Sequence, residues 1–359
     1  PGGRSGSAVA LSADGTVAAI GEYLFGNSNR GKTRVFEYDA ANDQWDQRLP
    51  ELAATDDGQR CGTSVALNSD GSVVAVGCTR SSLTVAEAGH AQLWKWDGDN
   101  SQYVRMGQDL PGEDLDESMG MSVALSADGQ ILAVGAYKHS GHQGRVSTFT
   151  YDAANDHWDD RGTVRGEVDG DFAGVSVDLS ADGTVLAIGA NKHHGPGLAD
   201  SGDVRVFDWV GGTWQLIRPA LSGEHSHDYA GTSVALSADG SILAIGAPKH
   251  NGGEDDEDGQ TRVFSWDGTA WQLVVELDGN GVQDNTGNAV ALSADASVLC
   301  VGTNLFNYND GSTTTSNTGK TNVYAVQFHP SPPFPPSSPP PQPPPSPVDG
   351  KWQDVASMV

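Results

Sequence analysis

The sequence has few positive charges, few cysteines and no long hydrophobic segment. It holds 20 Lys and Arg residues against 47 Asp and Glu residues, which gives a formal net charge of −27. Such a surface repels phosphate groups, so we expect neither nucleic acid nor an anionic membrane as a partner. No stretch of about 20 apolar residues is present, so no membrane span is predicted. Apolar spacings of three and four are absent too, which argues against helices.

Only three cysteines occur, too few for a disulfide framework. Cys61 and Cys78 flank the turn at Asp70-Gly71, and this spacing allows a cross-strand disulfide without requiring one. Cys300 holds a position that is alanine in other repeats, so a small buried residue is expected there. The chain begins at Pro1 rather than Met, and we expect a secreted protein whose signal peptide has been removed.

One motif recurs six times along the chain. It reads approximately G-x-S-V-A-L-S-A-D-G-x-x-L-A-I-G-A, then a polar loop, then V-x-V-F-x-W-D-G and a further Trp. The copies start near residues 6, 62, 120, 174, 231 and 287, and their turn aspartates are Asp14, Asp70, Asp128, Asp182, Asp239 and Asp295. A period this regular indicates an array of equivalent units. Because equivalent units seldom leave one chemically distinct pocket, we predict no enzyme, no catalytic residues and no cofactor.

The fifth copy predicts four strands. Residues 233–237 alternate apolar and polar residues, 242–247 form an apolar run, 261–266 alternate again, and 271–277 form a fourth strand. Tight turns separate the hairpin strands at Asp239-Gly240 and Asp267-Gly268. Four antiparallel strands repeated at this length predict an all-β, six-bladed β-propeller. The fourth strand carries an aromatic residue that we expect to pack between blades: Trp45, Tyr103, Trp158, Trp214 and Trp271.

The stretch G-T-S-V-A-L-S-A-D-G-S-I-L-A-I-G-A-P at residues 231–248 resembles an FG-GAP repeat, the blade unit of integrin-α-type propellers. The resemblance covers all six copies and implies an extracellular adhesion or recognition module. Calcium-binding members of that family carry D-x-D-x-D-G in a hairpin loop, whereas this chain has S-A-D-G with one carboxylate. Because calcium needs six or more oxygen ligands, no metal site is predicted. An acidic run at residues 255–258 offers only weak candidates for metal ligands: Asp255, Asp256 and Asp258.

A proline-rich segment interrupts the sixth copy. Residues 330–347 contain 12 of the 18 prolines, which excludes strand and helix and predicts a polyproline II rod. The segment resembles spacers of hydroxyproline-rich, pherophorin-like matrix glycoproteins, which implies hydroxylation and O-linked glycans. The candidate positions are Pro332, Pro333, Pro335, Pro336, Pro339, Pro340, Pro341, Pro343, Pro344 and Pro345.

Residues 348–359 resemble the missing fourth strand of blade six. The sequence V-D-G-K-W-Q matches the W-D-G-T-A-W-Q of copy five, and the strand would include Lys351, Trp352, Gln353 and Val355. The strand either returns to its own blade or completes blade six of a neighbouring subunit, as in donor-strand addition. The propeller itself is predicted to span residues 1–329.

Basic and acidic residues recur at equivalent loop positions of three blades. They predict either a polar platform for a ligand or neighbouring subunit, or inter-blade salt bridges. The set comprises Lys138, His139, Lys192, His193, Lys249, His250, Glu113, Glu167 and Glu224.

Together these features predict a structural subunit of an extracellular glycoprotein assembly that polymerises head to tail. The alternatives are a monomeric carbohydrate- or adhesion-binding propeller and, least favoured, a glycan-processing enzyme. Self-association and covalent O-glycans on the proline-rich segment are the expected partnerships.

Overall fold

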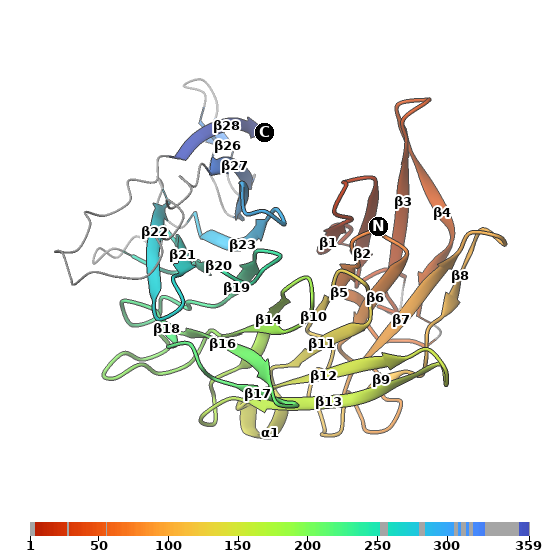
Figure 1. Cartoon of the computed structure of the whole chain (residues 1–359), viewed down its shortest axis with the longest axis horizontal. Coiled ribbons are helices and arrows are strands. Elements are labelled where there is room, and N and C mark those ends of the chain that lie inside the picture. Colours follow the sequence, from red (N-terminus) through yellow and green to blue (C-terminus); the bar gives the residue numbers. More distant parts are fainter. Residues whose placement is uncertain are drawn as a thin grey trace, which may run out of the picture.

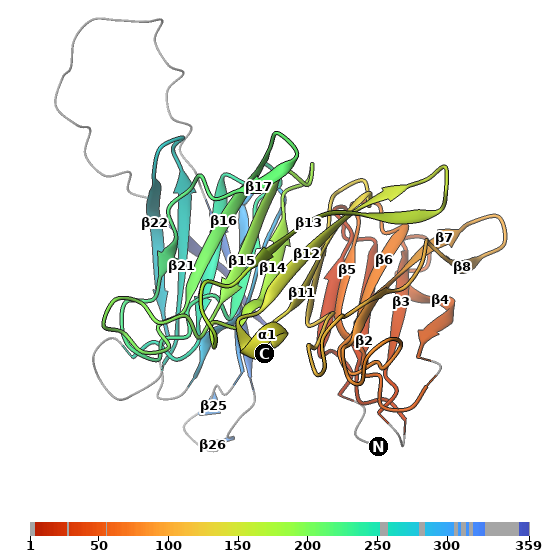
Figure 2. The ribbon, with the colours of Figure 1, turned by 90° about the horizontal axis from the view of Figure 1, so that it is seen from below.

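The computed structural model describes residues 4–26, 29–54, 56–251, 258–279, 284–304, 308–309, 314–315, 319–326 and 352–358. These residues form an all-β, six-bladed propeller of four-stranded antiparallel sheets, as the repeat predicts (Figures 1 and 2). Helix within the described residues is limited to the short turn α1, His139–His142. The polyproline prediction for residues 330–347, with its candidate glycosylation sites, falls outside the described residues, as do Lys351, Asp255 and Asp256.

The blades follow the chain in order, each from four strands, with two extra short strands beside the third strands of blades two and four. The first three blades contain β1 (Ala8–Leu11), β2 (Val17–Glu22), β3 (Lys32–Asp39) and β4 (Gln44–Ala53); β5 (Cys61–Leu67), β6 (Val73–Cys78), β7 (His90–Asp97), β8 (Gln102–Arg105) and β9 (Leu110–Pro111); and β10 (Ser122–Leu125), β11 (Ile131–Ala136), β12 (Arg145–Asp152) and β13 (His157–Arg165).

Blades four to six are built in the same way, and a separate two-stranded ribbon lies between the second and third strands of blade six. Their strands are β14 (Ala173–Leu179), β15 (Val185–Ala190), β16 (Asp203–Val210), β17 (Thr213–Gln215) and β18 (Leu221–Ser222); β19 (Ser233–Leu236), β20 (Ile242–Ala247), β21 (Gln260–Trp266) and β22 (Trp271–Asp278); and β23 (Thr286–Leu292), β24 (Val298–Thr303), β25 (Tyr308–Asn309), β26 (Thr314–Thr315), β27 (Lys320–Val326) and β28 (Trp352–Met358).

The S-A-D-G motif forms the turn of the first hairpin in blades one, three, four and five, whereas blade two has N-S-D-G and blade six has S-A-D-A. In blade five, the Ser237 hydroxyl donates to Oδ1 of Asp239 over 2.7 Å, and the Ser241 amide donates to the same oxygen over 2.9 Å. The Ser237 oxygen also accepts a hydrogen bond from the amide of Ile242, the first residue of β20. Gly240 has φ of +66°, which favours glycine. The motif therefore satisfies the polar groups of a tight turn and starts the second strand.

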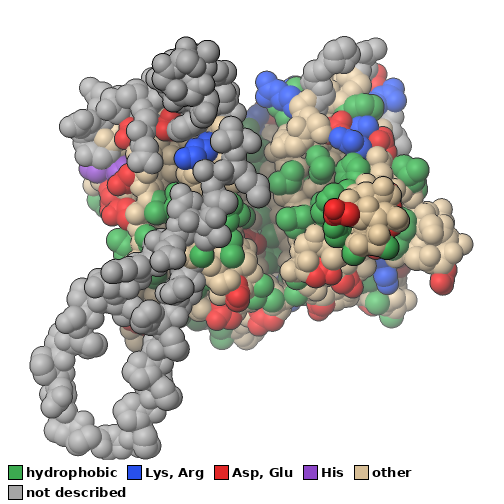
Figure 3. Space-filling view, turned by 90° about the horizontal axis from the view of Figure 1, so that it is seen from above, with side chains coloured by type: hydrophobic (Ala, Val, Ile, Leu, Met, Phe, Trp, Pro, Cys, Tyr) green, Lys and Arg blue, Asp and Glu red, His purple; other side chains and the backbone are tan. Residues whose placement is uncertain are grey.

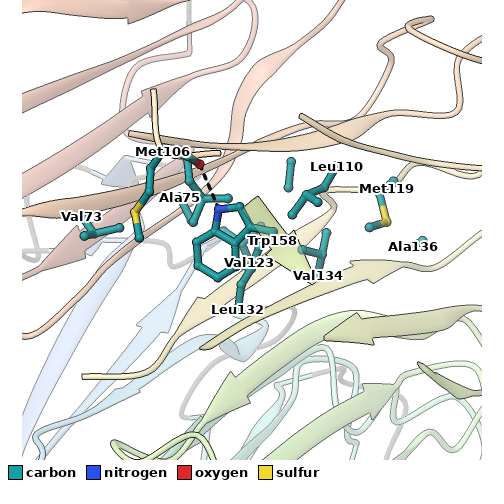
Figure 4. Close-up of a cluster of buried hydrophobic side chains, with 12 residues drawn as sticks. Val73, Ala75, Met106, Leu110, Met119, Val123, Leu132, Val134, Ala136 and Trp158 are labelled. Carbon is teal, nitrogen blue, oxygen red and sulfur yellow. Dashed lines mark hydrogen bonds between the residues drawn. The ribbon is translucent and has the colours of Figure 1, made fainter. Parts of the chain in front are cut away.

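Hydrophobic cores lie between successive blades. In blades two, three and four the second strand is buried on both faces, so its alternate residues contact the preceding and the following blade. Between blades two and three, for example, Val73 and Ala75 of β6 pack with Leu132 and Val134 of β11 (Figure 4). Trp158 of β13 completes this cluster, and its indole N–H donates to the Met106 carbonyl over 2.9 Å. Each blade is thus stabilised by its neighbours.

The aromatic residues of the fourth strands pair with aromatics of the third strands. Ring centroids lie 5.2 Å apart for Tyr151 and Trp158, and 5.3 Å apart for Trp266 and Trp271. Trp158 is buried against blade two, whereas Trp45 of blade one is 45% exposed. The aromatic residue of the fourth strand, here called the rim aromatic, therefore packs on the preceding blade. Trp45 of the first blade is in none of the core clusters formed by the described residues.

The strand predicted after the proline-rich segment is present as β28. It pairs antiparallel with β27 of the same chain, with Trp352 opposite Val326 and Met358 opposite Thr321. Gln353 and Val355 lie within this strand. Within one chain, therefore, β28 is the fourth strand of blade six.

The two cysteine predictions have different outcomes. Cys61 and Cys78 lie opposite each other in β5 and β6 and form a disulfide bond. Cys300 is only partly buried, unlike Ala187 and Ala244 at the same position of other blades. The difference arises because Cys300 points away from the core that joins blades five and six.

Candidate functional site

A cavity lies at one end of the first and second strands of blades one to three. It has a volume of about 480 Å³ and lies where β1, β5 and β10 begin and β2, β6 and β11 end. Its walls are mostly polar or charged: Ser7, Tyr23, Arg60, Thr63, Thr79, Arg80, Glu87, Asp116, Ser118, Met121, Tyr137 and Lys138. Because first strands of adjacent blades contact one another, this end of the strands opens around the centre of the propeller.

Three cations line the cavity although acidic residues dominate the whole chain. Arg80 pairs with Glu87, and the Lys138 ammonium lies 3.2 Å from the Asp116 carboxylate. Arg60 forms no ion pair among the residues that the structure describes. The cavity therefore combines two partly exposed ion pairs with one further cation, an arrangement suited to an anionic ligand.

Two cavity residues, Arg60 and Ser118, occupy one recurring backbone position, two residues before the first glycine of each copy. The residue there has positive φ in every copy, which shows that the conformation belongs to the blade framework. The side chain, in contrast, changes from blade to blade: Arg4, Arg60, Ser118, Phe172, Tyr229 and Asn285. The repeat thus holds five kinds of side chain at six equivalent places, and a chemically distinct site results.

Aromatic residues continue this surface toward blade four. The rings of Tyr137 and Phe172 meet edge to face with centroids 5.3 Å apart, and the Lys192 ammonium lies 4.9 Å from the Phe172 ring centroid. Aromatic faces beside hydroxyl and charged groups suit a polyhydroxylated ligand, because they contact its C–H surface while polar groups bind its hydroxyls.

The predicted polar platform is divided by the structure. Of its members, Lys138 lines the cavity, while His139 and His250 are buried. The glutamates at 113, 167 and 224 follow the last strands of blades two, three and four. Each pairs with an arginine in the third strand of the next blade: Arg145, Arg205 and Arg262. These ion pairs join successive blades, with arginines as their cations, and Lys138 pairs with Asp116.

The histidines of the platform contact buried carboxylates. Nδ1 of His193 lies 3.1 Å from Asp171, and Nδ1 of His250 lies 3.1 Å from Asp228. The hydrogen bond to Asp228 raises the pKa of His250, although burial opposes the shift. Asp228 also accepts the amides of Glu224 and His225. These carboxylates therefore cap the loop that enters each blade.

One group of possible metal ligands involves the same residues. Ligand atoms of His225, Asp228 and His250 lie within 4.8 Å of one another. Oδ2 of Asp228 already receives two backbone amides and the His250 ring, so the group is explained by its role in the loop. Of the weak metal candidates, Asp258 precedes β21, and its carbonyl accepts the Thr286 amide.

Most cavity residues escaped the sequence analysis. Lys138 was selected because it recurs as a Lys-His pair, whereas Arg60, Arg80 and Glu87 stand in no recurring pattern. The available signal was variation: the residue two positions before the first glycine of each copy changes, while the residues around it follow the repeat. A single consensus motif for the six copies does not show this variation.

Comparisons with known proteins support the fold. No family model matches the chain, and no curated protein matches its sequence. Among solved structures, a candidate 6-phosphogluconolactonase from Bacteroides uniformis matches with a TM-score of 0.60 and 12% identity, over 89% of this chain and 80% of that one. The periplasmic gluconolactonase of Pseudomonas aeruginosa matches with a TM-score of 0.59 and 16% identity, over 89% and 81%. A candidate 6-phosphogluconolactonase from Bacteroides fragilis matches with a TM-score of 0.59 and 12% identity, over 89% and 80%.

These comparisons correct the functional prediction. We expected a non-enzymatic structural subunit that forms filaments. The alternatives were a monomeric carbohydrate- or adhesion-binding propeller and, least favoured, a glycan-processing enzyme. The expectation of a non-enzymatic subunit is contradicted, because three solved propellers that each match 89% of the chain are described as lactonases. The physical reason lies in the loops: equivalent blades carry different side chains at equivalent positions, so repetition does not prevent a distinct cavity.

The sequence predicts no membrane span, because it has no stretch of about 20 apolar residues. No helix in the described ranges is long and apolar enough to cross a membrane.

Proposed function

We propose that the protein is a lactonase-like hydrolase that opens an anionic sugar lactone in the cavity of blades one to three. The observation that carries the proposal is the lining of that cavity, where Arg60, Arg80 and Lys138 gather with two carboxylates and several hydroxyl groups. The descriptions of the three similar propellers support the same chemistry. A sugar phosphate or sugar acid fits because its charge matches the cations and its hydroxyls match the Ser, Thr and Tyr side chains.

The cavity residues can perform each part of the reaction. Glu87 or Asp116 accepts a proton from water as the water oxygen bonds to the lactone carbonyl carbon. The cations stabilise the negative oxygen of the tetrahedral intermediate. The bond between that carbon and the ring oxygen then breaks, and the ring oxygen takes the proton from the carboxylic acid. The product is a hydroxy acid, which releases one proton to solution at neutral pH.

Proton release provides the test. The full chain is added to 6-phosphoglucono-δ-lactone and, separately, glucono-δ-lactone in a pH-stat, and the rate above spontaneous hydrolysis is measured. Replacing both carboxylates, Glu87→Gln with Asp116→Asn, should lower kcat by roughly 10²- to 10⁴-fold because the general base is lost. Asp57→Asn is the matched control, since Asp57 lies outside the cavity in an exposed pair with Arg30. No rate above background, or an unchanged double variant, contradicts the proposal.

We further propose that the protein acts in an oxidising compartment outside the cytoplasm. The Cys61–Cys78 disulfide supports this, because such bonds persist where thiols are not kept reduced. Alkylation and mass spectrometry of native material should find only Cys300 modified. Labelling of all three cysteines without reductant would contradict the assignment.

The finer family assignment belongs to the same proposal. The repeat at residues 231–248 supports descent from FG-GAP-type blades, and the proline-rich composition of 330–347 supports O-glycosylation. Intact mass spectrometry of native protein tests the second point, since glycans would add regular pentose or hexose increments.

A further inference from the structure

The ring of blades is interrupted between blade six and blade one. The five core clusters join blades one and two, two and three, three and four, four and five, and five and six. No cluster of the described residues joins blade six to blade one. Figure 1 shows the interruption between the β23 and β1 sides of the molecule, and Figure 3 shows a deep groove there.

Blade one exposes an apolar face toward this interruption. The valine of the first strand is buried in the next four blades, where Val65, Val123, Val177 and Val234 are 8–9% exposed. In those blades it packs in the cluster shared with the preceding blade. The equivalent Val9 is 68% exposed, and Leu11 beside it is 63% exposed. The missing contact is therefore that of a preceding blade.

Blade six exposes the opposite face. Val73 and Ala75 of β6 pack against the following blade and are 3% and 0% exposed. The equivalent residues of β24, Val298 and Cys300, are 36% exposed and partly buried respectively. Within the part of the chain that the structure describes, blade six thus lacks the contact of a following blade.

The polar contacts between blades show the same two open ends. At each of the five interfaces, a turn alanine or serine donates its amide to the turn carbonyl of the next blade; Ala13, for instance, donates to Ser69, and Ala238 to Ala294. The series begins with a donor in blade one and ends at an acceptor in blade six. In this series the carbonyl of Ala13 accepts no amide and the amide of Ala294 donates to no carbonyl. One additional blade between blades six and one could bond to both groups.

Glycine packing defines the shape of the open faces. At the five interfaces, a glycine of the second strand lies under the carbonyl of the glycine that begins the next blade; a Cβ at Gly246 would overlap the Gly287 carbonyl oxygen. Gly302 is the sixth second-strand glycine, and the nearest atoms to a Cβ there belong to Ala289 of its own blade. Gly6, the first glycine of blade one, has no atom within 4 Å of that position.

We propose that this open position is a docking surface for a seventh blade, a four-stranded antiparallel sheet carrying the same repeat. Such a blade would present an alanine amide and a second-strand glycine to blade one, and a turn carbonyl and a first-strand valine to blade six. The two faces are complementary to opposite sides of one blade, which distinguishes this occupant from an unrelated apolar partner. The proposal does not depend on the lactonase function.

The test supplies the blade in the same chain. A second copy of residues 231–281 is joined directly before Pro1, so that Arg4 follows the added blade as Asn285 follows repeat five. The added blade should raise Tm by roughly 5 °C or more, because each repeat adds a stabilising interface. The Cys300 thiol of blade six should react more slowly with a maleimide, because burial blocks access to the thiol.

A second reporter examines blade one. In a Cys300→Ala background, the thiol of Val9→Cys should lose reactivity when the blade is added, whereas that of Val210→Cys, an exposed residue of β16, should not. The matched control is Gly302→Val in the extended protein. Its side chain would overlap the added blade and should abolish the gain in Tm, while the same change should leave the original chain unaffected.

Three results overturn the proposal. The first is an unchanged Tm and unchanged reactivity of both thiols after addition of the blade. The second is a Val9→Cys thiol already protected in the original chain at every concentration, which would mean that blade six closes directly on blade one. The third is protection that grows with concentration in the original chain, which would mean that a second copy occupies the groove.

Discussion

At the scale of single residues, the repeated aspartate is a turn-forming group. Asp14 accepts hydrogen bonds from the Ser12 hydroxyl and from the Thr16 amide and hydroxyl. These bonds, that of Ser12 first, lower the pKa of Asp14 from 3.8 to about 2. Asp295 has the same arrangement with Ser293 and Ser297, and its pKa is also about 2. A carboxylate used in this way stabilises the hairpin only while ionised.

The lowered pKa values predict acid sensitivity. The folded pKa of Asp14 lies below its unfolded value, so its contribution is fully present above about pH 4 and is lost as the pH falls through about 2. Wild-type protein should therefore exceed Asp14→Asn in unfolding free energy at pH 6, and the difference should shrink between pH 4 and 2. Urea titrations across that range measure it, and a difference independent of pH contradicts the assignment.

A matched glycine pair tests the close approach of blades. Gly135→Val places a side chain against the carbonyl of Gly174 in the next blade, and backbone there cannot move aside. We expect a loss of at least about 2 kcal/mol in unfolding free energy. Gly302→Val, at the equivalent position of blade six, should change it by less than about 0.5 kcal/mol. Equal losses in the two variants would show that the glycine is needed for the strand itself.

At the scale of elements, strands were predictable and their partners were less so. Strands predicted at 233–237, 242–247, 261–266 and 271–277 are observed within one residue at each end. Alternation and turn chemistry are local, so they are readable from the sequence. The exposure of Val9 and Cys300 was not readable, because these residues sit in the same motif as buried ones and differ only in what lies beside their blade.

The rim aromatics, which lie in the fourth strands, allow a test of how much packing between adjacent blades stabilises the fold. Trp158 is 1% exposed between blades two and three, so Trp158→Ala should lower the unfolding free energy by about 3–5 kcal/mol. Trp45→Ala, at the equivalent and largely open position of blade one, should cost less than about 1 kcal/mol. Chemical denaturation of both variants gives the comparison. A smaller loss for Trp158→Ala than for Trp45→Ala would contradict the packing described here.

A disulfide bond joins β5 and β6, the first two strands of the second blade. It closes a segment with a sequence separation of 17 residues between Cys61 and Cys78. By loop-closure entropy, replacing both by alanine should lower the unfolding free energy by about 3 kcal/mol. Denaturation with and without reductant offers the control: reductant should destabilise the wild type and leave the double variant unchanged. A wild type that ignores reductant would contradict a structural role for the bond.

At the scale of the whole molecule, the repeat predicts the architecture but not the function. The period gives six equivalent blades, and the six sheets follow it. The cavity depends instead on loop residues such as Arg60 and Lys138, whose proximity arises only when three blades are assembled. The motif alone therefore does not indicate the function, because Arg60 and Lys138 lie outside it.

The central claim is that the positively charged side chains of the cavity bind an anionic lactone. Comparing two lactones that differ in charge tests it most directly. The measurement is kcat/KM for 6-phosphoglucono-δ-lactone and for glucono-δ-lactone, in wild type and in Arg60→Gln, under one set of conditions. We predict that the wild type prefers the phosphorylated lactone, and that Arg60→Gln reduces this preference by roughly 10- to 150-fold, the worth of one charged hydrogen bond. A wild type that hydrolyses neither lactone, or a preference untouched by Arg60→Gln, would contradict the account.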